Sequence, residues 1–328
     1  MLTKKQNLLE TINGGNPDRY VNQYEALGIV LGNPSGEVMA QPGQTMVSGW
    51  GVTFSWPLGT PGQFPVHDAE HLVVKDIENW REYVHAPKVK FPEEAWIPFV
   101  QQAEAIDRNE QFVMPFVAPG VFEQCHNLTE ISNCLTYLAL YPDEMKDLIK
   151  YITDWELELA EEYCKYLKPE GVFHHDDWGT QISTFMSPDM FAEFFLPAYK
   201  EIYGYYIDHG ADLIVHHCDS YAATLVPYMI EAGIKIWQGP QSTNNLPELI
   251  EKYGDKITFM GGIDSGIVDR PDWTPEHIEK VTREVCDACG TKYFIPCASQ
   301  GLWISTFPGV YDSVSAAIDK ISKEKFGN

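Results

Sequence analysis

Histidines, a cysteine and an aspartate follow one short apolar run of the sequence. The run Leu213–Val215 is followed by His216, His217, Cys218 and Asp219. If the run is a strand, alternate side chains point to opposite faces, so His216 and Cys218 share a face that His217 does not. Imidazole and thiolate are both preferred zinc ligands. We therefore expect His216 and Cys218 to point into the fold as half of a zinc site.

The last apolar run of the chain supplies a third candidate ligand. Cys297 follows Tyr293 and Ile295 at two-residue spacing and so shares their face. Together with His216 and Cys218 it gives zinc three protein ligands and leaves a fourth position open, as in catalytic zinc sites. Taken singly, each residue is better explained by ordinary core packing than by metal binding. Their joint placement at strand ends favours the metal.

A second polar cluster ends the run that begins at Gly171. His175 and Asp177 alternate with His174 and Asp176, so each pair occupies one face. An aspartate beside a histidine can orient the ring and tune its pKa. We predict His175 and Asp177 to be catalytic, while the opposite pair and a purely structural cluster remain open.

Polar or aromatic residues at the ends of other runs are candidates for binding a substrate. They are Glu123 and Asn127 after the run 111–119, Trp178 in 171–179, Gln238 in 234–239 and Asp264 in 257–264. Side chains of these types also cap helices or fill cores, so the structural alternative stays open.

The elements that must position these residues alternate between strands and helices. Five short apolar runs, at 171–179, 211–220, 234–239, 257–264 and 292–301, are separated by amphipathic stretches, and Ser187-Pro188 and Thr274-Pro275 are typical helix starts. The runs 111–119 and 50–56 are compatible with earlier strands. The pattern predicts an α/β fold, a (β/α)8 TIM barrel formed by one domain over 1–328 with an N-terminal helical extension at 1–45. In such barrels the catalytic groups lie at the carboxyl ends of the strands.

Charge and hydropathy limit the partners of this protein. The 328 residues include 23 Lys and Arg against 47 Asp and Glu, a formal net charge of −24. A chain this acidic is a poor binder of nucleic acid or of an anionic membrane. No uncharged apolar stretch approaches the roughly 18 residues of a membrane helix, and the N-terminus lacks a signal-peptide pattern. We therefore expect a cytoplasmic protein with reduced cysteines.

Several of these segments resemble the uroporphyrinogen decarboxylase superfamily, and within it the cobamide-dependent methyltransferase branch. The resemblance rests on GGNPDR (14–19), FHHDDWG (173–179), HHCDSYAATLVPYMIEAG (216–233), IWQG (236–239), FMGGIDSG (259–266) and YFIPCASQG (293–301). It implies a (β/α)8 barrel, and zinc on a His-x-Cys pair and a later cysteine, which fall on His216, Cys218 and Cys297.

The forms HHCDSYA and GGIDSG look like those of bacterial O-demethylase methyltransferases. The resemblance then implies zinc-dependent transfer of a methyl group from a small donor, such as an aryl methyl ether, to Co(I) of a separate corrinoid protein. One alternative is transfer from a methylcorrinoid to a thiol. Another is porphyrinogen decarboxylation, which fits less well because Arg19 and Arg81 are the only arginines among the first hundred residues.

Overall fold

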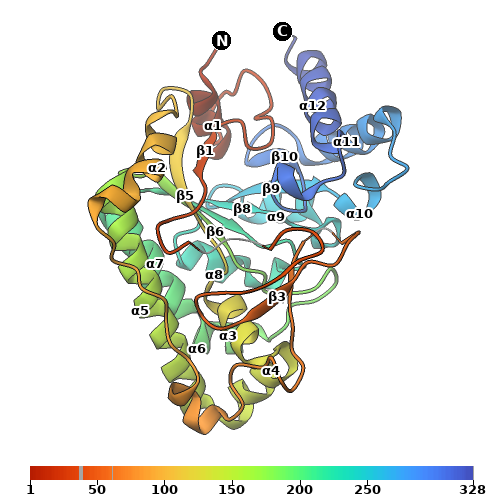
Figure 1. Cartoon of the computed structure of the whole chain (residues 1–328). Coiled ribbons are helices and arrows are strands. Elements are labelled where there is room, and N and C mark those ends of the chain that lie inside the picture. Colours follow the sequence, from red (N-terminus) through yellow and green to blue (C-terminus); the bar gives the residue numbers. More distant parts are fainter. Residues whose placement is uncertain (37–39, 61, 328) are drawn as a thin grey trace.

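The fold is built on a curled sheet of seven parallel strands, in a computed structural model that describes residues 1–36, 40–60 and 62–327 (Figure 1). The spatial order of the strands is β1 (Leu27–Val30), β5 (Phe112–Val117), β6 (Gly171–His175), β7 (Leu213–His217), β8 (Ile236–Gln238), β9 (Thr258–Ile263) and β10 (Phe294–Ala298). Successive strands are neighbours from β5 onward, as expected when each parallel strand returns through a helix. The predicted (β/α)8 class is confirmed, with β1 and β10 at the two edges of the seven strands found in the described ranges.

Helices connect the strands, and many of them cover the outer side of the sheet. They are α1 (Lys4–Ile12), α2 (Glu93–Glu104), α3 (Val121–Thr129), α4 (Ile131–Leu140), α5 (Pro142–Leu167), α6 (Pro188–Phe194), α7 (Leu196–Asp208), α8 (Val226–Glu231), α9 (Leu246–Tyr253), α10 (Ser265–Val268), α11 (Pro275–Cys289) and α12 (Val310–Phe326), with short 3-10 helices η1 (Ile77–Glu82), η2 (Ala223–Leu225), η3 (Ser242–Asn244) and η4 (Trp303–Ser305).

The predicted helix starts at Ser187 and Thr274 are confirmed. The Ser187 hydroxyl accepts the backbone N–H of Met190 at 3.2 Å, and the Thr274 hydroxyl accepts that of His277 at 3.3 Å. Each bond satisfies an N–H that has no partner inside its own helix.

The amino-terminal part differs from the sequence prediction in two respects. Within 50–56 only β3 (Thr53–Ser55) is a strand, and it belongs to a separate antiparallel sheet with β2 (Thr45–Val47) and β4 (Phe64–Pro65). The first barrel strand is instead β1, inside the segment 1–45 that was expected to be an extension. The physical reason is burial, because a strand of a parallel sheet is covered on both faces, as β1 nearly is, whereas β2 and β4 are largely exposed.

Two groups of buried side chains lie on the two sides of the curled sheet. Phe173, Val215 and Ile295 point to the inner side, where they pack in one cluster with Cys297. The alternate strand residues, such as Ile214, pack outward against the helices. The predicted phase of β7 is therefore wrong, because Ile214 lies on the same face of the strand as His216, which was expected to point inward.

None of the helices in the described residues is both long enough and apolar enough to cross a bilayer.

Candidate functional site

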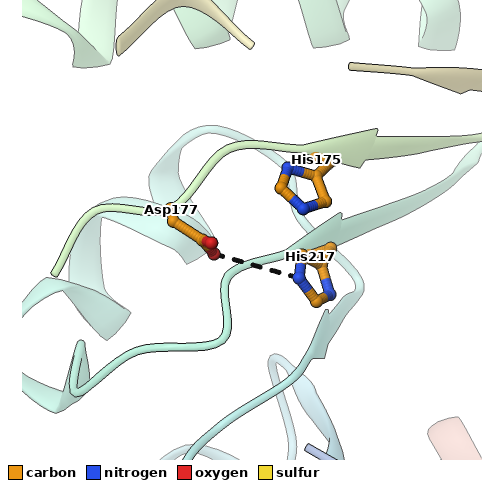
Figure 2. Close-up of side chains that lie close together, drawn as sticks. All are labelled: His175, Asp177 and His217. Atoms are coloured by element: carbon orange, nitrogen blue, oxygen red, sulfur yellow. Dashed lines mark ion pairs between the residues drawn. The ribbon is translucent and has the colours of Figure 1, made fainter. Parts of the chain in front are cut away.

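A cluster of two histidines and one aspartate lies where β6 and β7 end on the inner side of the sheet (Figure 2). His175 and His217 are paired across the two strands, and their rings stack with centroids 4.3 Å apart. Asp177 follows β6, and its Oδ1 lies 3.9 Å from His217 Nε2. One ligand atom from each of the three residues lies within 4.8 Å of the other two, which is close enough for one metal ion.

Each member of this cluster is held by a neighbouring group. His175 Nδ1 lies 2.9 Å from Glu123 Oε2, and His217 Nδ1 is hydrogen-bonded to Gln238 Oε1. Asp177 Oδ1 accepts the backbone N–H of Asp219 at 2.7 Å. The cluster is therefore built from α3, from β6, β7 and β8, and from the residues that follow β6 and β7.

Helix α3 owes its position to a carboxylate on the outer side of β6. Asp176 accepts the backbone N–H groups of Phe122 and Glu123, both at 2.9 Å, and a hydrogen bond from the Tyr199 hydroxyl. A carboxylate at a helix N-terminus satisfies free N–H groups and complements the helix dipole. Asp176 thereby fixes the first turn of α3, from which Glu123 reaches His175.

Burial and mutual charge shift the pKa values of the cluster in different directions. Burial alone lowers the pKa of His175, but the neighbouring Glu123 carboxylate outweighs it and raises that pKa to about 10. Burial and the nearby His175 hold the pKa of His217 well below its usual range. Burial raises the pKa of Asp177 to about 6, and burial together with the charge of Asp177 raises that of Asp219 to about 8. In the metal-free protein at neutral pH, His175 and Glu123 form an ion pair beside a neutral His217.

Aromatic rings line the inner side next to the cluster. Phe173 stacks on His217 with centroids 6.2 Å apart, and Phe116 stacks on Phe173 at 5.7 Å. Tyr24 packs against Phe173 at 6.0 Å and meets the ring of Trp303 at 6.2 Å. These rings, Tyr24, Phe116, Phe173 and Trp303, are called the aromatic wall below.

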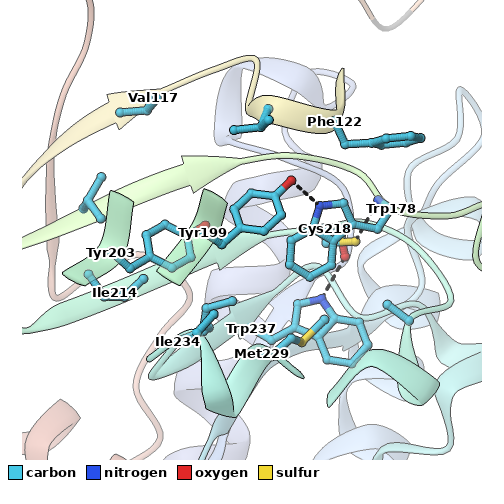
Figure 3. Packing of buried hydrophobic residues seen from close by; sticks show 14 of the residues in the cluster. Val117, Phe122, Trp178, Tyr199, Tyr203, Ile214, Cys218, Met229, Ile234 and Trp237 are labelled. Carbon is cyan, nitrogen blue, oxygen red and sulfur yellow. Dashed lines mark hydrogen bonds between the residues drawn. The ribbon is translucent and has the colours of Figure 1, made fainter. Parts of the chain in front are cut away.

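Two of the predicted zinc ligands, His216 and Cys218, lie on the helix side of the sheet, where Figure 3 shows Cys218. His216 Nδ1 lies 2.7 Å from the Tyr203 hydroxyl, and its ring stacks on Trp178 with centroids 4.0 Å apart. The sulfur of Cys218 accepts the backbone N–H of Trp178 at 3.3 Å. Both side chains are therefore engaged in packing against the helical layer.

The third predicted ligand, Cys297, lies on the inner side. Its sulfur is 4.0 Å from Gln238 Nε2 and 3.9 Å from Gln23 Oε1. The structure thus divides the predicted zinc set between the two faces of the sheet and does not bring it together. The cause is the phase of β7, because pairing with β6 places His217 beside His175 and turns His216 outward.

The predicted substrate-binding residues are distributed in the same way. Glu123 and Gln238 contact the cluster directly. Asn127 lies one turn further along α3, where its backbone carbonyl accepts a hydrogen bond from His67 at 3.0 Å. Trp178 is fully buried on the helix side, and Asp264 caps α10 by accepting the N–H of Gly266 at 2.9 Å.

Sequence reasoning missed His217 and Asp219. Both stand in the same segment as the chosen His216 and Cys218, on the alternate positions. The signal was therefore present, but alternation alone offers two phases and does not say which one faces inward.

Comparison with known proteins places this geometry in context. A family model described as "Uroporphyrinogen decarboxylase (URO-D)" matches residues 113–320. No curated protein matches the chain. A solved structure named "methyltransferase from Methanosarcina mazei" is similar over 98% of this chain and 99% of its own, with a TM-score of 0.67 and 15% sequence identity. At this identity the likeness demonstrates a shared fold.

Proposed function

The chain belongs to the uroporphyrinogen decarboxylase family, and we propose that it acts there as a methyltransferase. It takes a methyl group from a small donor, an aryl methyl ether, and passes it to Co(I) of a separate corrinoid protein. The full-length likeness in fold to a methyltransferase from Methanosarcina mazei supports the reaction class. The sequence segments that resemble O-demethylase methyltransferases support the donor and the acceptor.

The observation that carries the proposal is the position of the polar cluster beside the aromatic wall. In this wall the partly buried Phe116 and the exposed Trp303 can offer ring surface to an aromatic donor, whereas Phe173 is buried. His175, Asp177 and His217 lie at the end of that wall, where they can face the ether oxygen. Removing the methyl group leaves a phenolate, whose developing charge has to be stabilised. A divalent metal such as zinc, when bound, supplies Lewis-acid stabilisation of that oxygen.

Charge argues against porphyrinogen decarboxylation. A substrate with many carboxylates requires cations around it, but the cluster contains Asp177 and is contacted by Glu123. Arg19 is hydrogen-bonded to Asp18, and Arg81 donates two bonds to Asp147, so both early arginines already have anionic partners. The net charge of −24 acts in the same direction.

The test uses cob(I)alamin as a stand-in for the corrinoid protein. The purified, zinc-supplemented protein is mixed anaerobically with cob(I)alamin and a panel of methoxylated phenols, and the methyl-cobalt absorbance is followed. We expect methyl-cobalt to form with at least one donor, and to form far more slowly with His217→Gln. Cys218→Ala, which changes a side chain on the helix side, is the matched control.

Other outcomes would contradict the proposal. If methyl-cobalamin reacts only in the presence of a thiol, the direction of transfer is the reverse. If the protein releases CO2 from uroporphyrinogen and transfers no methyl group, it is a decarboxylase.

A further inference from the structure

We propose that His175, Asp177 and His217 together bind a divalent transition-metal ion of the zinc type, with no cysteine in the ligand set. The catalytic use of this ion rests on the proposed methyl transfer, whereas its binding can be measured without any donor or corrinoid.

The proton of His217 is fixed by Gln238. The amide nitrogen of Gln238 lies 3.5 Å from the carbonyl oxygen of Ala298, which can only accept, so the amide oxygen faces His217. That oxygen also only accepts, so His217 Nδ1 carries the hydrogen. Because a neutral imidazole has one N–H, His217 Nε2 is left with a free lone pair, as metal coordination requires.

The proton of His175 is fixed by Glu123 in the same way. The carboxylate of Glu123 lies 2.9 Å from His175 Nδ1 and accepts its hydrogen, so Nε2 is the nitrogen that a metal ion can bind by displacing its proton. Metal-binding histidines usually donate their second N–H to a carboxylate or carbonyl oxygen, and here a carboxylate and an amide oxygen take that place. In both imidazoles Nδ1 is therefore held by a neighbouring side chain, and Nε2 is the nitrogen that can coordinate the metal.

Asp177 completes the set. Its Oδ1 lies 3.9 Å from His217 Nε2, which is too long for a hydrogen bond. Two ligand atoms that each lie about 2.0–2.2 Å from a tetrahedral zinc ion are about 3.4 Å apart, so side-chain rotations that bring the two atoms about 0.5 Å closer would let both bind one ion. The backbone N–H of Asp219 holds the same oxygen at 2.7 Å and keeps the carboxylate directed toward the histidines.

The donor set selects the class of ion. Two imidazole nitrogens and one carboxylate oxygen suit zinc and its first-row neighbours, whereas Mg²⁺ and Ca²⁺ prefer oxygen throughout. Three protein ligands leave a coordination position for an exogenous oxygen, as in catalytic zinc sites. Cys297 is separated from the histidines by the Gln238 side chain, to which its sulfur is adjacent.

The experiment measures metal binding by the unmodified protein first. The protein is stripped with a chelator and titrated with Zn²⁺ in a calorimeter and with Co²⁺ in a spectrophotometer. We expect one ion per chain, visible d–d bands, and no thiolate-to-cobalt charge-transfer band in the near ultraviolet. A thiolate band would overturn the proposed ligand set, and so would binding well below one ion per chain.

Variants then assign the ligands. His175→Gln and His217→Gln should abolish the Co²⁺ spectrum, while Glu123→Gln and Gln238→Leu should weaken affinity roughly 10- to 100-fold. Cys297→Ser and Cys218→Ala should leave the spectrum and affinity unchanged, and circular dichroism verifies that every variant is folded. Loss of the spectrum in Cys297→Ser with retention in His217→Gln would overturn the proposal.

Failure of this site and failure of the proposed function are distinguishable. A protein that binds Co²⁺ as described but transfers no methyl group retains the metal site and loses the function. A protein that transfers methyl groups but binds neither Zn²⁺ nor Co²⁺ retains the function and loses the site.

Discussion

A chain of buried hydrogen bonds on the helix side of β6 and β7 determines the protons of two histidines. His216 Nε2 donates to the backbone carbonyl of Asp176 at 3.1 Å, so its Nδ1 accepts from the Tyr203 hydroxyl at 2.7 Å. The Tyr203 oxygen then accepts from His174 Nδ1 at 3.1 Å, and His174 Nε2 shares one further proton with Glu156 at 2.9 Å. This series of hydrogen bonds ends at the backbone carbonyl of Asp176, so it holds in place the segment that carries Asp177.

Replacing Tyr203 tests this chain. In Tyr203→Phe both His216 Nδ1 and His174 Nδ1 lose their partner inside the core, and an unsatisfied buried group costs about 1–3 kcal/mol. We expect the free energy of unfolding in urea to fall by at least about 1 kcal/mol. Tyr205→Phe, on the partly exposed side of α7, is the control and should change stability by less than about 0.5 kcal/mol. Equal effects of the two changes would contradict the role given to the Tyr203 hydroxyl.

His126 on α3 makes stability depend on pH. Burial lowers the pKa of His126, so the unfolded chain, with a pKa near 6.5, binds the proton more strongly than the folded protein. Its contribution to stability is therefore complete above about pH 6.5 and is lost as the pH falls toward the lowered folded pKa.

The role of His126 is tested by comparing the free energy of unfolding of the natural protein with that of a variant at two pH values. In His126→Phe, which retains a ring beside Phe122, this loss is absent. The free energy of unfolding of the variant minus that of the natural protein should be larger at about pH 5.5 than at about pH 7.5, as measured by urea unfolding. A difference that is independent of pH would rule out titration of His126 in this range.

At the scale of elements, the site depends on the contact between the start of α3 and the end of β6. The backbone N–H of Gly120 donates to the carbonyl of His175 at 2.7 Å, which ties the start of α3 to the end of β6. A Cβ at Gly120 would lie 2.5 Å from Asp176 Cβ and 2.6 Å from His174 Cε1. Glycine is therefore needed so that the helix can approach the strand closely enough for Glu123 to reach His175.

Two glycine-to-alanine changes test this close approach. Gly120→Ala should destabilise the protein by about 1–3 kcal/mol through overpacking and should weaken Co²⁺ binding, because α3 has to move away from His175. Gly204→Ala, inside α7 with no heavy atom within 4 Å of the added Cβ, is the control. It should be neutral or stabilising by up to about 1 kcal/mol, since alanine favours helix. Retention of full Co²⁺ affinity in Gly120→Ala would show that α3 tolerates the shift.

At the scale of the whole molecule, the net charge of −24 affects stability. Self-repulsion of a strongly charged chain opposes the compact state and is screened by salt. Salt also weakens surface ion pairs such as Lys150 with Asp154, but exposed pairs of this kind contribute at most about 1 kcal/mol each.

Repulsion should therefore decide the sign of the salt effect. We expect the urea midpoint at pH 7 to rise when NaCl is increased from about 0.02 M to about 0.3 M. Glu104→Gln, at the exposed last residue of α2, removes a negative charge from a helix C-terminus and should raise the midpoint at low salt and matter less at high salt. A falling midpoint would mean that the ion pairs outweigh the repulsion.

From Gly171 onward, the sequence by itself determined the elements and their chemistry. The strand-forming runs at 171–179 and 211–220, the helix starts at Ser187 and Thr274, and the polar residues that end each run follow from local preferences and are found in the structure. The same reasoning selected His175, Asp177, Glu123 and Gln238, which the structure brings together. Local patterns succeed here because a cap or a strand end depends on a few neighbouring residues.

Only the tertiary structure decided which side of each strand faces inward. The strand β7 is buried along its whole length, so its sequence lacks the contrast between polar and apolar faces that would reveal its phase. Pairing with β6 set that phase, placed His217 beside His175, and left His216 and Cys218 among the helices. A shift of one residue exchanges the two faces, and the contacts that exclude it come from strands and helices distant in the sequence.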